Sequence, residues 1–560
     1  MSSIAPTSAR LPGSAPRRRA GSGEPFVWLA GMGLVTGLLM ITALLLLILV
    51  KGVEAFWPLR LARIQLTTAA AERFGQPVLY GHILGTTEKR VGEPDESGQR
   101  PMEYKLQVGN RDVTGTGFMY LDVTDVASIE FPDDLARIDR VEYGPALGTI
   151  VSLAQPGQPV LEGPAAIPLL QRLVSEGNAR RARIERIEKR DIGDVNAAME
   201  VLRRERRRLD QSGGGDAASV ASIESREQTL EAQYERLAAD ARELRAQQDA
   251  ANLTYRLAKG QERTIPVGNV VAVHFPNQPG FLGRVGQAIA NAWAFVSESP
   301  REANTEGGIF PALFGTFVMT VILSVAVTPF GVLTAIYLRE YAREGAVVRA
   351  VRIAINNLAG VPSIVFGVFG LGFFVYVLGG SIDRLFYSDR EGPVFGTGGI
   401  LWASLTLALM TVPVVIVATE EALAAVARGV REGSLACGAS KWQTIQRVVL
   451  PAAAPGIITG MILAMARGAG EVAPLMITGV VKLAPTLPLD TTFPFLHLDR
   501  KFMHLGFHIY DVGFQSPNIE AALPMVYMTT VLLMLVIVAL NLSAILIRNH
   551  LRRKLSASVF

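Results

Sequence analysis

The chain has 560 residues, a net charge of +4 at pH 7, and a composition that is 49% hydrophobic and 19% charged. This composition is more apolar than soluble averages yet rich in charge, which predicts a chain partly embedded in a membrane and partly in water. Cys437 is the only cysteine, so an intrachain disulfide and a metal cluster held by cysteines are excluded. The basic residues lie beside apolar segments or in a charge-balanced stretch, which indicates membrane orientation and argues against nucleic-acid binding.

Six apolar segments are long enough to cross a bilayer. The first, 26–50, follows a basic tail at 1–25 and exceeds the roughly 20 apolar residues that a span requires. No small-residue cleavage site follows it, so a transmembrane helix is favoured over a cleaved signal peptide. The other five segments contain Gly, Pro, Ser and Thr, as packed membrane bundles do. They are 312–338, 353–378, 400–418, 452–480 and 521–546.

The short basic segments predict the orientation of these spans. They are 17–19, 339–352, 428–447 and 548–554. With six spans, all four fall on one side, which the positive-inside rule assigns to the cytoplasm. Both termini, including a tail at 549–560, are then cytoplasmic, and the long stretch 60–308 lies outside the cell membrane.

The stretch 60–279 predicts an extracytoplasmic α+β domain. Segments with alternating or β-forming residues predict strands of one sheet. They are 78–84, 104–108, 116–123, 127–131, 149–153 and 269–275. At about 172–258, apolar residues recur every seven positions in two arms separated by the glycines 213–215, which predicts an antiparallel helical hairpin. The repeated positions are Val195, Leu202 and Leu209 in one arm and Ile223, Leu230, Leu237 and Leu244 in the other.

Residues 280–300 predict an amphipathic helix with Trp293 on its apolar face. Phe281, Leu282, Val285 and Ile289 recur with Trp293 at spacings of three and four. Such a helix is typical of a membrane interface. The alternative is an ordinary amphipathic helix that covers the β-rich domain with its apolar face.

The segment 420–451 carries the most specific motif. Glu432 is followed by a glycine at the seventh position, an aliphatic residue at the seventeenth and a terminal Leu-Pro pair. These later positions are Gly438, Val448, Leu450 and Pro451. The pattern resembles the coupling loop of ABC-importer permeases, although Gly433 and Ser434 replace the alanines usual in that family. The resemblance implies a helix, a glycine turn and a second helix that seat in a groove of a separate ATPase subunit.

A superficial similarity to a phosphate-binding loop arises from Gly433, Gly438 and Lys441. The lysine is displaced from the required position and no hydrophobic strand precedes the first glycine. The chain is therefore predicted to be a permease subunit without an ATPase site. No cofactor is expected on this chain, because ATP would be used by a partner subunit.

Four further stretches are similar to the phosphate permeases of the PstA type. They are GGIFPALFGT from Gly307, AIYLREYA from Ala335, NNLAGVPSIVFGVFGLGFF from Asn356 and RGAGEVAPLMITG from Arg467. The resemblance implies a five-helix permease core at 309–548, a homologous second permease, two cytoplasmic ATPase subunits and an extracytoplasmic phosphate-binding protein. The expected fold is an all-α polytopic bundle of six spans in a bacterial inner membrane, with a large extracytoplasmic α+β insertion.

Arg467 and Glu471 are the charged residues expected inside a span. Four residues apart, they would share one helix face and avoid lipid. They are predicted to form either a structural ion pair or a station for an oxyanion, since guanidinium binds phosphate oxygens in a bidentate way. His504 and His508 share the same spacing, and packing at the outer mouth is favoured there over a metal site.

Three functions remain open at this point. The first is passage of inorganic phosphate, and the second is passage of another oxyanion such as sulfate or molybdate. The third is a membrane-anchored sensor or scaffold, which the six spans and the segment 420–451 disfavour.

Overall fold

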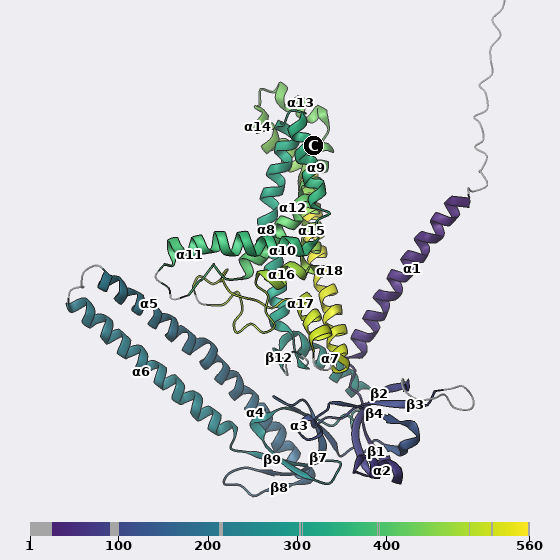
Figure 1. The fold of residues 1–560 in the computed structure, drawn as a ribbon. Coiled ribbons are helices and arrows are strands. Elements are labelled where there is room, and N and C mark those ends of the chain that lie inside the picture. Colours follow the sequence, from purple (N-terminus) through teal and green to yellow (C-terminus); the bar gives the residue numbers. More distant parts are fainter. Residues whose placement is uncertain are drawn as a thin grey trace, which may run out of the picture. The chain divides into compact units, whose positions relative to one another are not determined.

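The computed structural model describes residues 25–89, 100–211, 217–301, 304, 306–388, 390, 392–491, 493–516 and 519–557 (Figure 1). The chain divides into two compact units, Met1–Lys51 and Gly52–Phe560. The basic residues 17–19 lie outside the described part. Helix α1 (Pro25–Glu54) contains the first predicted span.

Within the described residues, six helical stretches are long and apolar enough to cross a membrane, as predicted. They are Val27–Glu54, Phe310–Tyr341, Ser363–Phe386, Ile400–Ala424, Lys441–Gly470 and Ala522–His550. The helices that form the last five are α8 (Phe310–Ile336), α10 (Ser363–Phe369), α11 (Gly380–Phe386), α12 (Ile400–Ala424), α14 (Lys441–Thr444), α15 (Leu450–Gly470) and α18 (Ile519–Ala557). Because α18 reaches Ala557, the predicted C-terminal tail is helical over most of its length.

Two predicted spans contain a helix break, and a proline follows each break. The predicted span 353–378 is wrong at its start, because α9 (Ala346–Leu358) is a separate helix and the span begins after Pro362. The predicted span 452–480 is wrong at its end, because α15 stops at Gly470 and a short helix α16 (Ala473–Thr478) follows. A proline cannot donate a hydrogen bond to the carbonyl oxygen four residues earlier, and its ring clashes with that group. Pro362 and Pro474 stand four residues after Leu358 and Gly470, where α9 and α15 end.

Helix α12 lies at the centre of the bundle core. It packs against α8 and α15, and its buried residues include Leu407, Met410 and Val415. Small residues permit the close approach: a Cβ atom at Gly331 of α8 would lie 2.6 Å from a methyl group of Val415. A well-packed core of this kind holds the ends of the three helices in fixed relation.

The β-rich domain contains two sheets, which corrects the prediction of one. The first has the order β4-β3-β2-β1-β5 and the second the order β10-β9-β7-β6-β11, with β8 paired to β7. The first comprises β1 (Leu61–Leu66), β2 (Val78–Glu88), β3 (Met102–Gln107), β4 (Phe118–Asp122) and β5 (Val126–Glu130). The second comprises β6 (Leu135–Arg140), β7 (Ala146–Ala154), β8 (Leu161–Glu162), β9 (Asn252–Arg256), β10 (Glu262–Pro266) and β11 (Val270–His274). The predicted strands 149–153 and 269–275 are thus in the second sheet.

The remaining short elements connect these parts. Helix α2 (Thr68–Phe74) follows β1, and β12 (Pro300–Arg301) pairs with β13 (Glu306–Gly307) just before α8. Helix α7 (Phe281–Ser297) occupies the predicted amphipathic segment.

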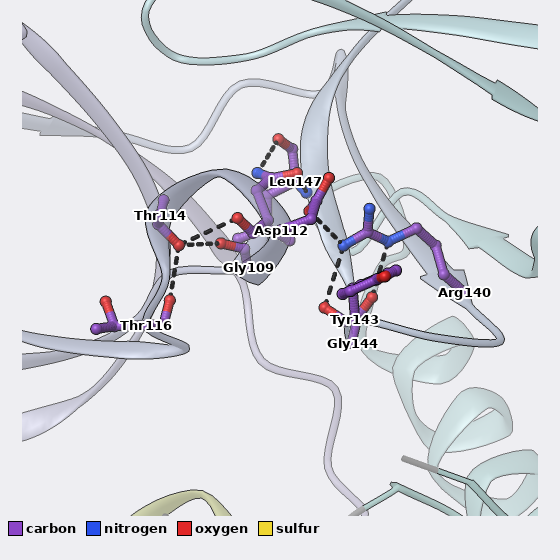
Figure 2. A network of polar contacts seen from close by, with 9 residues as sticks. Gly109, Asp112, Thr114, Thr116, Arg140, Tyr143, Gly144 and Leu147 are labelled. Carbon is purple, nitrogen blue, oxygen red and sulfur yellow. Dashed lines mark hydrogen bonds and ion pairs between the residues drawn. The ribbon is translucent and has the colours of Figure 1, made fainter.

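A polar network joins the two sheets (Figure 2). Helix α3 (Arg111–Thr114) follows β3 of the first sheet, and its Asp112 accepts a 2.9 Å hydrogen bond from the buried Arg140 of β6. Arg140 also donates to the carbonyl oxygens of Tyr143 and Gly144 (Figure 2). Partial burial tends to raise the pKa of Asp112, but the hydrogen bond and charge of Arg140 outweigh it, so this pKa lies below its usual value. The contact therefore remains ionic at neutral pH.

The predicted helical hairpin is present, but it begins at Ile167, before the predicted start near residue 172. It consists of α4 (Ile167–Arg186), a π turn (Ile187–Asp191), α5 (Ile192–Gln211) and α6 (Ala217–Gln248). Ion pairs join Glu188 to Arg245 and Glu205 to Arg226. Glu205 comes after Glu188 in the chain, whereas its partner Arg226 comes before Arg245, so the two arms are antiparallel. Figure 1 shows α5 and α6 side by side.

The predicted turn and the predicted C-terminal limit of the hairpin have different outcomes. The glycines 213–215 lie outside the described residues. The C-terminal limit near residue 258 is wrong, because α6 ends at Gln248 and β9 already belongs to the second sheet.

Candidate functional site

The segment 428–451 forms a helix, a glycine turn and a second helix. Helix α13 (Arg428–Ala436) ends just before Gly438, whose φ of 84° lies in the left-handed region that favours glycine. Ser440 then caps α14, accepting a hydrogen bond from the Gln443 amide, while the Gln443 side chain accepts one from the Ser440 amide. This reciprocal pair is a capping box, which fixes where the second helix begins.

The two arms contact each other through side chains. The hydroxyl oxygens of Ser434 and Thr444 are 3.0 Å apart, and Thr444 is buried. Ser434 occupies one of the positions where alanine is usual, so this departure adds a polar contact between the arms. On the outside, Glu432 and Gly438 are exposed, as are the large apolar side chains of Leu435 and Trp442.

The later motif residues lie where the second arm enters the membrane helix. Val448 belongs to a π turn (Ile445–Val449), and Leu450 and Pro451 begin α15. The Leu450 amide donates to the carbonyl oxygen of Ile445, five residues earlier. Pro451 has no amide hydrogen to donate. The π turn that precedes it therefore leaves no amide of Pro451 without a hydrogen-bond partner.

The loop is bonded to the ends of two membrane helices. Arg431 donates hydrogen bonds to the carboxylate of Glu340 and to the carbonyl oxygen of Leu423 in α12. Lys441 donates to the carbonyl oxygen of Glu340 and lies 4.9 Å from the ring centre of Tyr341. Glu340 and Tyr341 belong to the π turn that ends the first core span. Glu340 lies within AIYLREYA, one of the stretches similar to PstA-type permeases, but the sequence alone predicted no role for it.

Tight packing positions the helix that follows the loop. A Cβ atom at Gly460 of α15 would lie 2.7 Å from the Cβ atom of Ala418 in α12. A Cβ atom at Gly456, one turn earlier, would lie even closer to the Cβ atom of Ala422. Because the two helices are packed this closely, α15 cannot slide freely along α12, and a movement of α15 would also displace the neighbours of both helices.

Arg467 and Glu471 are brought together, but not on one helix face as predicted. Arg467 lies in the last turn of α15, whereas Glu471 follows the helix end with extended backbone. The Arg467 Nε atom is 3.9 Å from the Glu471 Oε1 atom, and the two side chains are 38% and 25% exposed. The pair thus spans the break between α15 and α16, where both charges remain partly accessible.

His504 and His508 are buried around α17 (Leu505–Tyr510). The amide of Leu505 donates to the hydroxyl of Thr316, which fixes this segment to α8. Nearby in sequence, the buried Asp511 is 3.1 Å from the Lys482 ammonium. In the part of the chain that the structure describes, no group of three or more His, Cys, Asp or Glu residues could hold a metal ion. Both imidazoles are buried, and packing remains the prediction for them.

The six spans, with a loop bonded to the ends of two of them, define a polytopic membrane protein. The chain belongs to the family described as binding-protein-dependent transport system inner membrane component, whose model matches residues 327–557. "Probable ABC transporter permease protein YqgI" of Bacillus subtilis strain 168 is 31% identical over 275 residues, which are 48% of this chain and 86% of that protein.

Two other comparisons give a sequence relative and a solved structure. "Phosphate transport system permease protein PstA 1" of Mycobacterium tuberculosis strain CDC 1551 is 34% identical over 242 residues, which are 43% of this chain and 71% of that protein. A solved chain of the MetNI methionine ABC transporter is 20% identical with a TM-score of 0.32, covering 46% of this chain and 96% of that chain. The resemblance to PstA-type permeases is confirmed, and the chain is a multi-pass membrane permease of an ABC importer.

Proposed function

We propose that this permease passes inorganic phosphate into the cytoplasm of a bacterial cell and is driven by separate ATPase subunits through the loop 420–451. The observation that carries the proposal is the bonded helix–glycine–helix segment. Its outer surface presents Leu435 and Trp442, while its inner side is hydrogen-bonded to Glu340 and Leu423. A force applied to the outer surface would therefore reach two membrane helices without passing through a flexible connection.

The loop suits a role in coupling better than a role in ATP chemistry. Gly433 lies inside α13, and Lys441 is occupied by its contacts with Glu340 and Tyr341. We propose that this chain binds no cofactor and that ATP is hydrolysed by two cytoplasmic partner subunits. A homologous second permease and an extracytoplasmic phosphate-binding protein would complete the importer.

Phosphate is proposed as the substrate on two grounds. One relative, 71% of whose length this chain covers, carries phosphate transport in its name. The charges at Arg467 and Glu471 also suit this anion, because a guanidinium binds two oxygens of one oxyanion. Phosphate near neutral pH keeps a hydroxyl group that can donate a hydrogen bond to the Glu471 carboxylate, whereas sulfate has no such group. Uptake measured with phosphate against sulfate and molybdate separates these substrates.

The proposed orientation places both termini in the cytoplasm and the domain 60–279 outside. It rests on the basic segments 339–352, 428–447 and 548–554, which lie at the same side of the predicted spans. The coupling loop would then face the cytoplasm, where an ATPase has access to ATP.

Cysteine labelling tests this orientation. The native Cys437 is exposed in the loop, so a membrane-impermeant maleimide should leave it unmodified in intact cells and label it after lysis. A Val201→Cys variant in a Cys437→Ser background places the thiol on an exposed position of α5 and should react in intact cells. Labelling in the reverse order would contradict the orientation.

A further inference from the structure

The polar face of α7 is turned toward the protein. Arg284 donates a 2.9 Å hydrogen bond to the carbonyl oxygen of Pro58, and Asn291 donates a 3.1 Å bond to that of Phe56. Gln287 lies 3.4 Å from a ring nitrogen of His274 on β11. The positions 284, 287 and 291 are three and four residues apart, so they share one side of the helix. This side of the helix is therefore hydrogen-bonded to the segment before β1 and lies against β11.

The exposed face of α7 is apolar. Leu282 is 83% exposed, Ile289 66% and Trp293 72%, and these positions are separated by seven and four residues. Gly286 and Ala290 are exposed between them. A helix that covers a soluble domain buries its apolar face, whereas α7 shows the opposite arrangement. The alternative in which α7 covers the β-rich domain with its apolar face is contradicted.

Helix α7 is joined to both connections between the domain and the spans. At its C-terminal end, the amides of Ile309 and Phe310 donate to the carbonyl oxygens of Phe295 and Glu298, and α8 begins at Phe310. Phe56, two residues after the end of α1, stacks edge-on against Phe295 with ring centres 5.5 Å apart. These contacts hold α7 where the chain passes from a predicted span into water.

We infer that the exposed face of α7 is covered by membrane lipid at the boundary between headgroups and acyl chains. Three observations favour lipid over a protein partner: the contact with the first residues of a span, the absence of acidic residues from Phe281–Ser297, and the aromatic and basic side chains around it. Arg284 lies 5.2 Å from the ring centre of Trp57, and Trp293 is on the exposed face. Tryptophan is enriched at this depth of a bilayer, and an interfacial helix buries its apolar face about 5–10 Å into it.

The lipid contact does not depend on which substrate the permease carries. It anchors the domain at the membrane surface, on the outer leaflet if the proposed orientation holds. Since α7 is hydrogen-bonded to the start of α8, a movement of that span would be opposed by the helix's attachment to lipid.

A spin label on Ile289→Cys tests the inference in the complete complex, reconstituted in phosphatidylcholine–phosphatidylglycerol bilayers. All variants carry Cys437→Ser. Val538→Cys provides a reference on the exposed surface of α18, and Val201→Cys a reference on the aqueous hairpin. The ratio of collisions with oxygen to collisions with a nickel chelate rises with depth in the bilayer. At Ile289 this ratio should exceed that at Val201 at least about threefold and lie nearer the value at Val538.

Two results would overturn the inference. A ratio at Ile289 equal to that at Val201 places the face in water. Low collision rates with both reagents place it under a protein. If the labelled variant does not assemble, the native Trp293 serves instead: brominated lipid should quench wild-type fluorescence more than that of Trp293→Phe, and equal quenching would contradict lipid contact.

Discussion

Replacing Gly438 by valine should lower ATP-driven uptake at least about tenfold while the complex still assembles. The φ of 84° at this position is strained for a β-branched residue by roughly 1 to 3 kcal/mol. About 1.4 kcal/mol corresponds to a factor of ten in the population that keeps the turn. A Cβ atom at Gly438 meets nothing within 4 Å, so the effect arises from the backbone and not from a clash. Initial rates of substrate uptake and of ATP hydrolysis measure the loss.

Two matched variants give this prediction its control. Gly438→Asn should retain most transport, because asparagine tolerates left-handed backbone far better than valine. Gly433→Ala should be nearly neutral, since Gly433 lies inside α13 with open space at its Cβ position. Normal uptake by Gly438→Val, with the ATPase still bound, would refute the role of the turn. Equal losses in all three variants would show only that the loop tolerates no change.

Arg467→Gln should nearly abolish phosphate uptake. A charge buried in a bilayer costs on the order of 3 kcal/mol even on lenient scales, so a retained arginine is expected to face a pore or a partner. Its partial exposure and its 3.9 Å separation from Glu471 leave guanidinium donors available to an anion. Arg467→Lys keeps the charge and loses the bidentate fork, so it should assemble normally and transport several-fold more slowly.

A double variant separates a pathway role from an internal ion pair. If Arg467 only neutralises Glu471, then Arg467→Gln combined with Glu471→Gln should restore the uptake that the single change removes. If Arg467 contacts the anion, the double variant should remain inactive. Glu471→Gln alone shows how much of any loss comes from the carboxylate. Normal uptake in the double variant would rule out the pathway role.

The features that could be predicted from the sequence are those that depend on local backbone chemistry or on the length of an apolar segment. The resemblance that Glu432, Gly438 and Pro451 carry implies a helix, a glycine turn and a second helix, and the structure contains them. Apolar length alone was sufficient for the six spans, because a bilayer requires a fixed run of apolar residues. The roles assigned to the motif residues remain predictions.

Other features depend on contacts between distant residues and were missed for that reason. The strands β1 and β6 each mix apolar with charged residues, and nothing local distinguishes two sheets from one. The bonds from Arg431 and Lys441 to Glu340 join residues about 90 and 100 positions apart. The helix end at Gly470 could have been predicted, because Pro474 cannot donate a hydrogen bond to the Gly470 carbonyl oxygen and its ring clashes with that group. A spacing of four residues places two side chains on one face only where the helix between them is unbroken.

We propose that this chain forms the membrane path of an ATP-driven phosphate importer. The most direct test is uptake of radiolabelled phosphate by proteoliposomes that contain the complex purified through a tag on this chain. ATP is supplied on the side of the coupling loop, and the complex's own binding protein on the other. The proposed function predicts phosphate accumulation that requires ATP, is unaffected by a large excess of sulfate or molybdate, and is lost in Gly438→Val. ATP-dependent uptake of sulfate or molybdate without uptake of phosphate would contradict it.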